Sequence, residues 1–149
     1  MKLNEVMLPK KAGFIPYITE ETKTGPVRQF MFMIPSDANF GGTKPSFAKG
    51  MVDPGENSKQ AAIREAEEEL GLKQSNLKTD TVELAWNGIM HGDDESYAMT
   101  MYIGEVKSKS DFNKAHWETG SVWWMTAEEF IAEGRKAHIS VFKQIVSLL

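Results

Sequence analysis

Cysteine is absent from this chain of 149 residues, which excludes disulfide bonds, thiolate nucleophiles and zinc sites built on cysteine. Long apolar runs are missing as well. The N-terminal stretch 1–9 lacks a continuous apolar core of signal-peptide length, and no later run approaches the length of a membrane span. The sequence therefore predicts a cytosolic protein with no membrane partner.

A strong charge of either sign is also lacking. The 17 Lys and Arg against 21 Asp and Glu leave a formal net charge of −4, which gives no electrostatic reason to expect tight binding to bulk nucleic acid. None of the three histidines has a metal-ligand spacing. The length, the hydrophobic content of 41% and the charged content of 26% are those of an ordinary globular protein and predict a single domain over residues 1–149.

Residues 50–72 form the most informative stretch of the chain. It opens with Gly50-Met51-Val52-Asp53-Pro54-Gly55, a composition in which glycine and proline predict a tight loop. Asn57 or Ser58 can then cap a helix built mostly from good helix formers. Gly71 ends that helix.

This helix places three carboxylates on one face. At about 100° per residue, Glu65, Glu68 and Glu69 fall within an arc of roughly 100°. Each like-charge pair at this spacing costs a few tenths of a kcal/mol, and a divalent cation would reverse that sign. Oxygen-rich clusters of this kind suit Mg²⁺ or Mn²⁺, which complete their shell with water and substrate phosphate. The alternative is a solvated acidic helix in which Arg64 pairs with Glu68.

Written as a pattern, the stretch is Gly50, five residues, Glu56, seven residues, and then Arg64-Glu65-Ala66-Glu67-Glu68-Glu69-Leu70-Gly71-Leu72. This resembles the Nudix box, and the chain is therefore similar to the Nudix hydrolases. The soft match is Ala66, where the family usually carries a larger aliphatic residue. That difference weakens helix packing more than it threatens metal binding.

The resemblance implies a metal site and a reaction. Glu65, Glu68 and Glu69 become the metal-facing carboxylates, with the Gly50 carbonyl in the same shell and Glu68 and Glu69 as the principal ligands. The implied cofactor is Mg²⁺, or Mn²⁺. The metal would bridge phosphate oxygens and lower the pKa of a bound water, which splits a pyrophosphate bond by in-line attack.

The resemblance also implies supporting roles. Glu56 and Arg64 match positions that brace the loop and orient the carboxylates. Glu65 is either a ligand or the acceptor of the proton from the attacking water. Because the general base of some relatives comes from a later loop, Glu118 is a further catalytic candidate and Glu95 a weaker one.

The implied substrate is a small nucleotide: a nucleoside diphosphate linked to another group, such as ADP-ribose, an FAD- or NAD-type dinucleotide, or a dinucleoside polyphosphate. Lys49, next to the glycine whose carbonyl would face the metal, is a candidate phosphate contact. Phe47 and Trp86 are candidates for stacking on a base. So are Phe14, Tyr17 and Trp123, although aromatic residues on strands more often pack in a core.

Two other functions compete with this one. A nucleotide-sensing module could keep the fold and lose the chemistry, but every acidic position of the box is retained. An enzyme acting on 5′-capped RNA ends would need a basic channel, for which the candidates are Lys10, Lys11, Lys44 and Lys49. The sequence leaves open whether the protein forms a homodimer, which would be one way to complete a substrate pocket.

The rest of the chain predicts an α+β protein, or mixed α/β sandwich, with strands before and after one helix and a helix at the end. Pro16 suggests that a first strand over 12–18 lies at an edge, and residues 20–26 read as a turn. A strand over 27–34 is apolar on both faces, which is typical of a central strand. The remaining expected elements are strands over 79–86 and 97–106, a loop and then a strand within 118–125, a helix opened by a capping box at Thr126, and a helix over 138–149. The resemblance implies the Nudix fold, a mixed sheet between helices with a loop-helix-loop motif.

Overall fold

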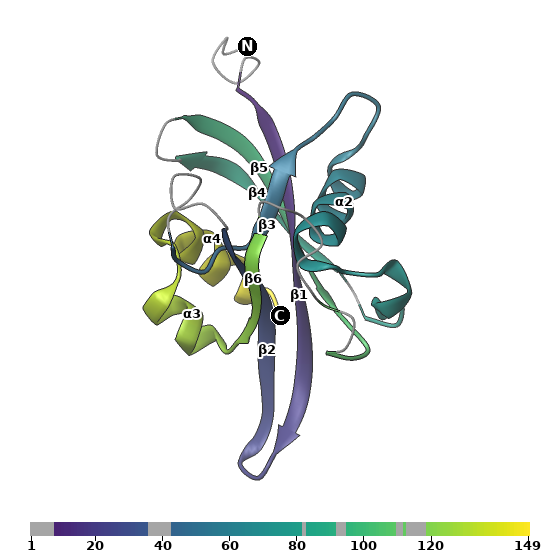
Figure 1. Cartoon of the computed structure of the whole chain (residues 1–149), viewed down its shortest axis with the longest axis vertical. Coiled ribbons are helices and arrows are strands. Elements are labelled where there is room, and N and C mark those ends of the chain that lie inside the picture. The colour runs from purple at the N-terminus through teal and green to yellow at the C-terminus, as the bar shows by residue number, and fades with distance from the viewer. Residues whose placement is uncertain (1–7, 36–42, 82, 92–94, 110–111, 113–118) are drawn as a thin grey trace.

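One mixed sheet runs through the molecule, and helices cover both of its faces (Figure 1). The computed structural model describes residues 8–35, 43–81, 83–91, 95–109, 112 and 119–149. The strands are β1 Lys10–Thr22, β2 Gly25–Pro35, β3 Ala48–Met51, β4 Leu84–His91, β5 Ser96–Glu105 and β6 Thr119–Met125. The helices are α2 Ser58–Leu70, α3 Ala127–Glu133 and α4 Lys136–Val146, with a short 3-10 helix at Gln74–Asn76.

Strand β1 organises the sheet, whose order is β4-β5-β1-β2-β6, with β3 pairing to β1 off this path. It pairs in parallel with β5 and antiparallel with β2 and β3. Strands β4 and β5 form the expected antiparallel hairpin. The predicted α+β sandwich with a mixed sheet is therefore confirmed.

Alternation along β1 separates two apolar cores. Ala12 and Phe14 face α2, whereas Ile15 and Tyr17 face the side covered by α3 and α4. Figure 1 shows α2 on one side of the sheet and α3 with α4 on the other. The helix predicted to carry the carboxylates therefore has one face of the sheet to itself among the described helices.

The prediction that Pro16 marks an edge strand is wrong, because β1 is central. Val106 N–H donates to Tyr17 C=O, so the odd-numbered residues of β1 turn their polar groups toward β5. The ring nitrogen of Pro16 faces the opposite side. There it falls between the last β3 pair, at Phe14, and the first β2 pair, at Tyr17. A residue without an N–H fits at this change of partner.

Several predicted boundaries shift. The turn expected over 20–26 narrows to residues 23 and 24, where Gly25 (φ 114°) opens β2. The strand expected over 79–86 begins only at Leu84. Thr126 caps α3 with the predicted capping box. Within the described residues no helix has both the length and the apolar character needed to cross a membrane.

Candidate active site

A tight turn leads from β3 into α2. Glu56 N–H donates to Asp53 C=O at 3.0 Å, and Gly55 (φ 85°) takes the left-handed position that follows a proline in such turns. The Glu56 carboxylate also accepts the Asp53 N–H at 2.9 Å. The loop predicted from its glycines and proline is thus closed at both ends by Glu56.

Helix α2 begins with a reciprocal cap. The Asn57 side chain accepts the Gln60 N–H at 2.8 Å, and the Gln60 side chain accepts the Asn57 N–H at 2.9 Å. The cap residue is therefore Asn57 and not Ser58. Gly71, at φ 76°, ends the helix in the left-handed conformation that glycine tolerates.

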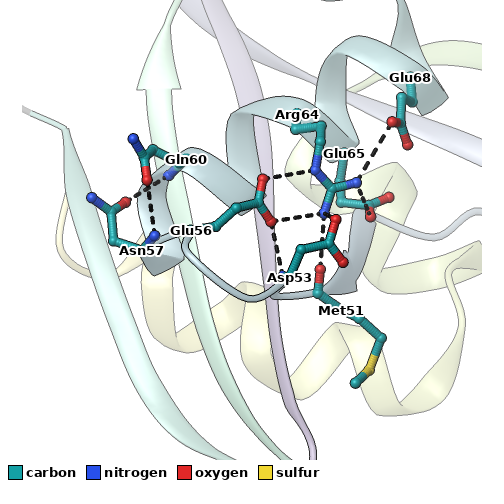
Figure 2. A network of polar contacts seen from close by, with 8 residues as sticks. All are labelled: Met51, Asp53, Glu56, Asn57, Gln60, Arg64, Glu65 and Glu68. Atoms are coloured by element: carbon teal, nitrogen blue, oxygen red, sulfur yellow. Dashed lines mark hydrogen bonds and ion pairs between the residues drawn. The ribbon is translucent and has the colours of Figure 1, made fainter.

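Arg64 lies at the centre of the polar network that ties this loop to the helix (Figure 2). Its guanidinium makes a two-pronged contact with the Glu56 carboxylate at 2.8 and 3.0 Å and donates to Met51 C=O at 3.0 Å. It also donates to Glu65 at 3.0 Å and lies 3.5 Å from Glu68. The Arg64 hydrogen bonds hold the pKa of Glu56 below its usual range, and Glu56 in turn raises the pKa of Arg64. Both groups stay charged, and the loop is held to one turn of α2.

The three glutamates of the acidic face differ in burial. The Glu65 side chain is 13% exposed and Glu69 is 9% exposed, whereas the Glu68 side chain is 42% exposed. The Arg64–Glu68 pair of the solvated-helix alternative is present. Two of the three carboxylates are nevertheless shielded from water, so the face as a whole is not a solvated one.

Strand β3 is in close contact with this face. A Cβ built on Gly50 would lie 2.1 Å from a carboxylate oxygen of Glu65, so a side chain at this position would collide with it. Lys49 N–H donates to the Glu69 carboxylate at 3.0 Å. Glu65 and Glu69 therefore lie against Gly50 and Lys49, the two residues that the sequence predicts beside the metal.

The donor atoms here suit a hard divalent cation, because carboxylates and a backbone carbonyl are the oxygen ligands that Mg²⁺ and Mn²⁺ prefer. Among the residues that the structure describes, no three His, Asp or Glu side chains are arranged as a group that could hold one ion. Glu65 is turned toward Arg64, and Glu69 accepts a backbone N–H. The chemistry of the donors fits a metal, whereas their side chains would have to turn to share one.

Cations gather on the other side of β3. The Lys49 ammonium lies 5.3 Å from the centre of the Tyr97 ring, and the Lys11 ammonium lies 4.3 Å from it. Burial first, and then the charges of Lys11 and Arg135, lower the pKa of Lys49 to about 8, although Glu69 and Glu65 act to raise it. Glu95, the weaker base candidate, lies 3.4 Å from Lys11. A multiply charged anion would relieve the repulsion among these cations.

The aromatic residues predicted to stack on a base differ in their burial and contacts. Phe47 is 1% exposed and stacks on the His138 ring at 3.9 Å between centroids, so the prediction that it contacts a base is wrong. Trp86 is half-buried, packs against the core on the α4 side and donates its indole N–H to Gln144 at 2.9 Å. Its contact with a base stays a prediction. Trp123 is 54% exposed on β6, whereas Tyr17 is buried in the core.

His138 is the residue near this site that the sequence analysis missed. Its Nδ1 accepts the Phe47 N–H at 3.2 Å, and the ring is 1% exposed. The spacing of His138, Phe142 and Ile145 at i, i+4 and i+7 could have indicated that it shares their buried stripe. Glu118, the candidate base, lies outside the described residues.

The structure therefore combines a mixed sheet between helices with one loop-helix motif that holds three glutamates beside a glycine. The model of the NUDIX domain family matches residues 19–145, and the chain belongs to this family. The predicted resemblance is confirmed.

Named relatives agree with this. An uncharacterized Nudix hydrolase, orf19, from Rhodococcus erythropolis is 32% identical over 98 residues, which is 62% of this chain but only 51% of that protein. An RNA pyrophosphohydrolase from Wolbachia pipientis (subspecies Culex pipiens, strain wPip) is 24% identical over 66% of this chain and 68% of its own length. The first relative bears the name of the same family, and this chain spans about half of its length.

A solved structure supports the fold. A binary complex of the C. elegans Ap4A hydrolase superposes with a TM-score of 0.73 and 21% identity, over 95% of this chain and 96% of that one. At that identity the similarity establishes the Nudix fold and not the substrate.

Proposed function

We propose that the protein is a Mg²⁺- or Mn²⁺-dependent hydrolase that cleaves the pyrophosphate bond of a nucleoside diphosphate linked to another group. The observation that carries this proposal is the fixed arrangement of Gly50 and the Glu65 carboxylate, held by Arg64 and Glu56. A purely structural helix would have no need for repelling glutamates held against a glycine.

In this proposal Glu68 and Glu69 hold the metal. The Gly50 carbonyl, the third ligand that the resemblance implies, points toward Ala12 of β1 in the β1–β3 pairing, so only its second lone pair is left for the metal. When bound, the cation neutralises phosphate charge and lowers the pKa of a water. Glu65 serves either as a further ligand or as the acceptor of the proton from that water. Its hydrogen bond to Arg64, at 3.0 Å, favours the ionised carboxylate that both roles require.

The cations on the far side of β3 supply the substrate contact. Lys49 contacts a phosphate of the substrate, and Lys11, beside the same Tyr97 ring, contacts a neighbouring phosphate. The two ammonium groups favour a substrate with at least two linked phosphates over a monophosphate. Candidate substrates are ADP-ribose, FAD- or NAD-type dinucleotides and dinucleoside polyphosphates, the last being the substrate class named for the C. elegans neighbour.

The test is hydrolysis of a panel that contains ADP-ribose, FAD, NADH, diadenosine polyphosphates, nucleoside triphosphates and capped RNA. Each is assayed with Mg²⁺, Mn²⁺ or EDTA, and products are separated by chromatography. We expect metal-dependent cleavage of one class between two phosphorus atoms. Complete inactivity of the folded protein across the panel would overturn the proposal and favour a nucleotide-sensing module.

A second candidate is hydrolysis at the 5′ end of RNA, favoured by the relative named RNA pyrophosphohydrolase. Lys10, Lys11, Lys44 and Lys49 would have to line the path of the chain. Cleavage of capped RNA, with small dinucleotides left intact, would support this function over the first.

A further inference from the structure

Side chains form hydrogen bonds with the backbone along the outer edge of β3 and of Phe47, the residue before it. Val52 N–H donates to Lys10 C=O at 3.0 Å, so the backbone N–H and C=O groups of the even-numbered residues of this segment point toward β1. The backbone groups of Phe47, Lys49 and Met51 face the other way. The three bonds they make are Phe47 N–H to His138 Nδ1 at 3.2 Å, Lys49 N–H to Glu69 Oε2 at 3.0 Å, and Arg64 Nη2 to Met51 C=O at 3.0 Å.

Two of these partners belong to the acidic motif on α2, and the third comes from α4 on the opposite face of the sheet. The His138 ring stacks on Phe47 with an interplanar angle of 10°. Nearby, Arg135 N–H donates to Pro45 C=O at 2.9 Å, which adds a second link between α4 and the same segment. The start of α4 is therefore hydrogen-bonded to Pro45 and Phe47, just before Lys49.

The ring must be neutral to make this bond. An Nδ1 that accepts the Phe47 N–H carries no proton, which places the proton of the neutral ring on Nε2. Burial, with the nearby charges of Lys49 and Arg135, lowers the pKa of His138 well below its ordinary value of 6.5. Among the described residues Nε2 has no hydrogen-bond partner, so Nδ1 makes the one polar contact found for this ring.

We propose that His138 is a positioning residue of the active site: through the Phe47 N–H it fixes the segment that carries Lys49 and Gly50 against Glu69 and Glu65. The importance of Lys49 and Gly50 rests on the proposed function, whereas the link from His138 to the segment does not. The bond joins α4 to the chain that enters β3, so a helix far from the acidic motif in sequence sets the position of two of its neighbours.

Two variants separate the bond from the packing. His138→Phe keeps a ring that can stack on Phe47 but removes the acceptor, whereas His138→Asn keeps an acceptor near the place of Nδ1 but removes the ring. Phe142→Leu, in the same helix, is the matched control because it removes buried volume without touching the Phe47 N–H.

The first measurement is nitrogen and amide NMR of the protein without metal or substrate. We expect an imidazole with its proton on Nε2 well below pH 6.5. The amide signals of Phe47, Lys49 and Gly50 should move in His138→Phe and lie closer to the wild type in His138→Asn. A proton on Nδ1, or unmoved amides in His138→Phe, would overturn the proposal. This measurement needs no activity, so it decides the link even if the panel of substrates shows none.

The second measurement is steady-state hydrolysis of the substrate that the panel identifies. We expect kcat to fall about 10-fold in His138→Phe, the usual scale for losing a group that orients a ligand, and KM to rise because Lys49, the proposed phosphate contact, lies on the same segment. His138→Asn should restore part of kcat despite lower thermal stability. Phe142→Leu should lose stability and keep kcat. Equal kcat in wild type and His138→Phe, with an active wild type, would show a packing role alone.

Discussion

Glu68 allows the metal role to be separated from stability. Its side chain is the most exposed of the three glutamates, so Glu68→Gln should leave the fold intact and collapse metal-dependent turnover, by about 100-fold or more. Thermal unfolding and hydrolysis with and without Mg²⁺ measure the two effects. Glu67→Gln, on the same helix and bonded to Gln74, is the matched control and should stay active. An active Glu68→Gln enzyme would contradict the proposed ligand role.

Gly50 tests the close contact between β3 and α2. In Gly50→Ala the new methyl group would meet the Glu65 carboxylate, which must move and give up its place beside Arg64. We expect a loss of about 1–3 kcal/mol in unfolding free energy and at least about a 10-fold loss of activity. Gly25→Ala, in the β1–β2 turn, should lose stability and keep its activity. Equal activity losses in both variants would mean that instability alone explains the effect.

At this scale the sequence located most of the residues that the structure brings together. The spacing of Glu56 and Arg64 within a recognisable motif predicts their contact, because both positions lie in one local loop and helix. It could not place Phe47 or His138 correctly. Their burial depends on α4 packing against the chain that enters β3, a contact between residues 91 positions apart in the chain.

The start of helix α2 can be tested by its cap. Asn57→Ala removes the acceptor for the Gln60 N–H and should cost about 1 kcal/mol, or roughly 3 °C in melting temperature. Thr126→Ala removes the same kind of cap from α3 and is the matched control. We expect similar melting losses but reduced activity only in Asn57→Ala, since only that cap adjoins Glu56. Undiminished activity in Asn57→Ala would show that the cap does not position the motif.

The contact between His138 of α4 and Phe47, the residue before β3, predicts a pH dependence of stability. The pKa of His138 is lowered in the folded state, so the unfolded chain binds the proton more readily once the pH drops below 6.5. Stability is then present above pH 6.5 and lost as the pH falls, by up to about 1.4 kcal/mol per pH unit. Urea unfolding between pH 7.5 and about 5 measures this slope, which should flatten in His138→Phe and persist in a variant of the exposed His91. A steep slope retained in His138→Phe would assign the effect to other groups.

Elements with local signals were predicted well, and those defined by distant partners were not. The capping box predicted at Thr126 lies within four residues and is present, and Asn57 is one of the two cap residues predicted for α2. The position of β1 was misjudged because Pro16 is compatible with an edge or with a change of partner, and only the pairing with β3 and β2 distinguishes them. The start of β4 is set by its pairing with β5, and the alternation of apolar residues over 79–86 carries no information about that pairing.

At the scale of the whole molecule, a net charge of −4 should make binding of bulk nucleic acid weak, with Lys11, Lys49 and Arg135 forming only a local cationic site. Fluorescence anisotropy with a labelled RNA duplex at about 50 and 200 mM salt measures this, and affinity should fall steeply as salt rises. A short capped RNA is the comparison ligand. Tight binding of the duplex that does not respond to salt would contradict the prediction. That residues 1–149 form a single domain, and that the protein can form a homodimer, stay predictions.

The central place of β1 has a kinetic consequence. Its parallel partner, β5, pairs Lys10 with Ala98, so the middle of the sheet closes only after most of the chain is present. Pairings this distant in sequence are reached slowly, because the entropy of closing the intervening loop is lost before the contacts form. The β1–β2 hairpin can form early on its own local turn, whereas the pairing of β1 with β5 forms late. The amides of β1 that bond to β5 should accordingly be among the slowest to exchange with solvent.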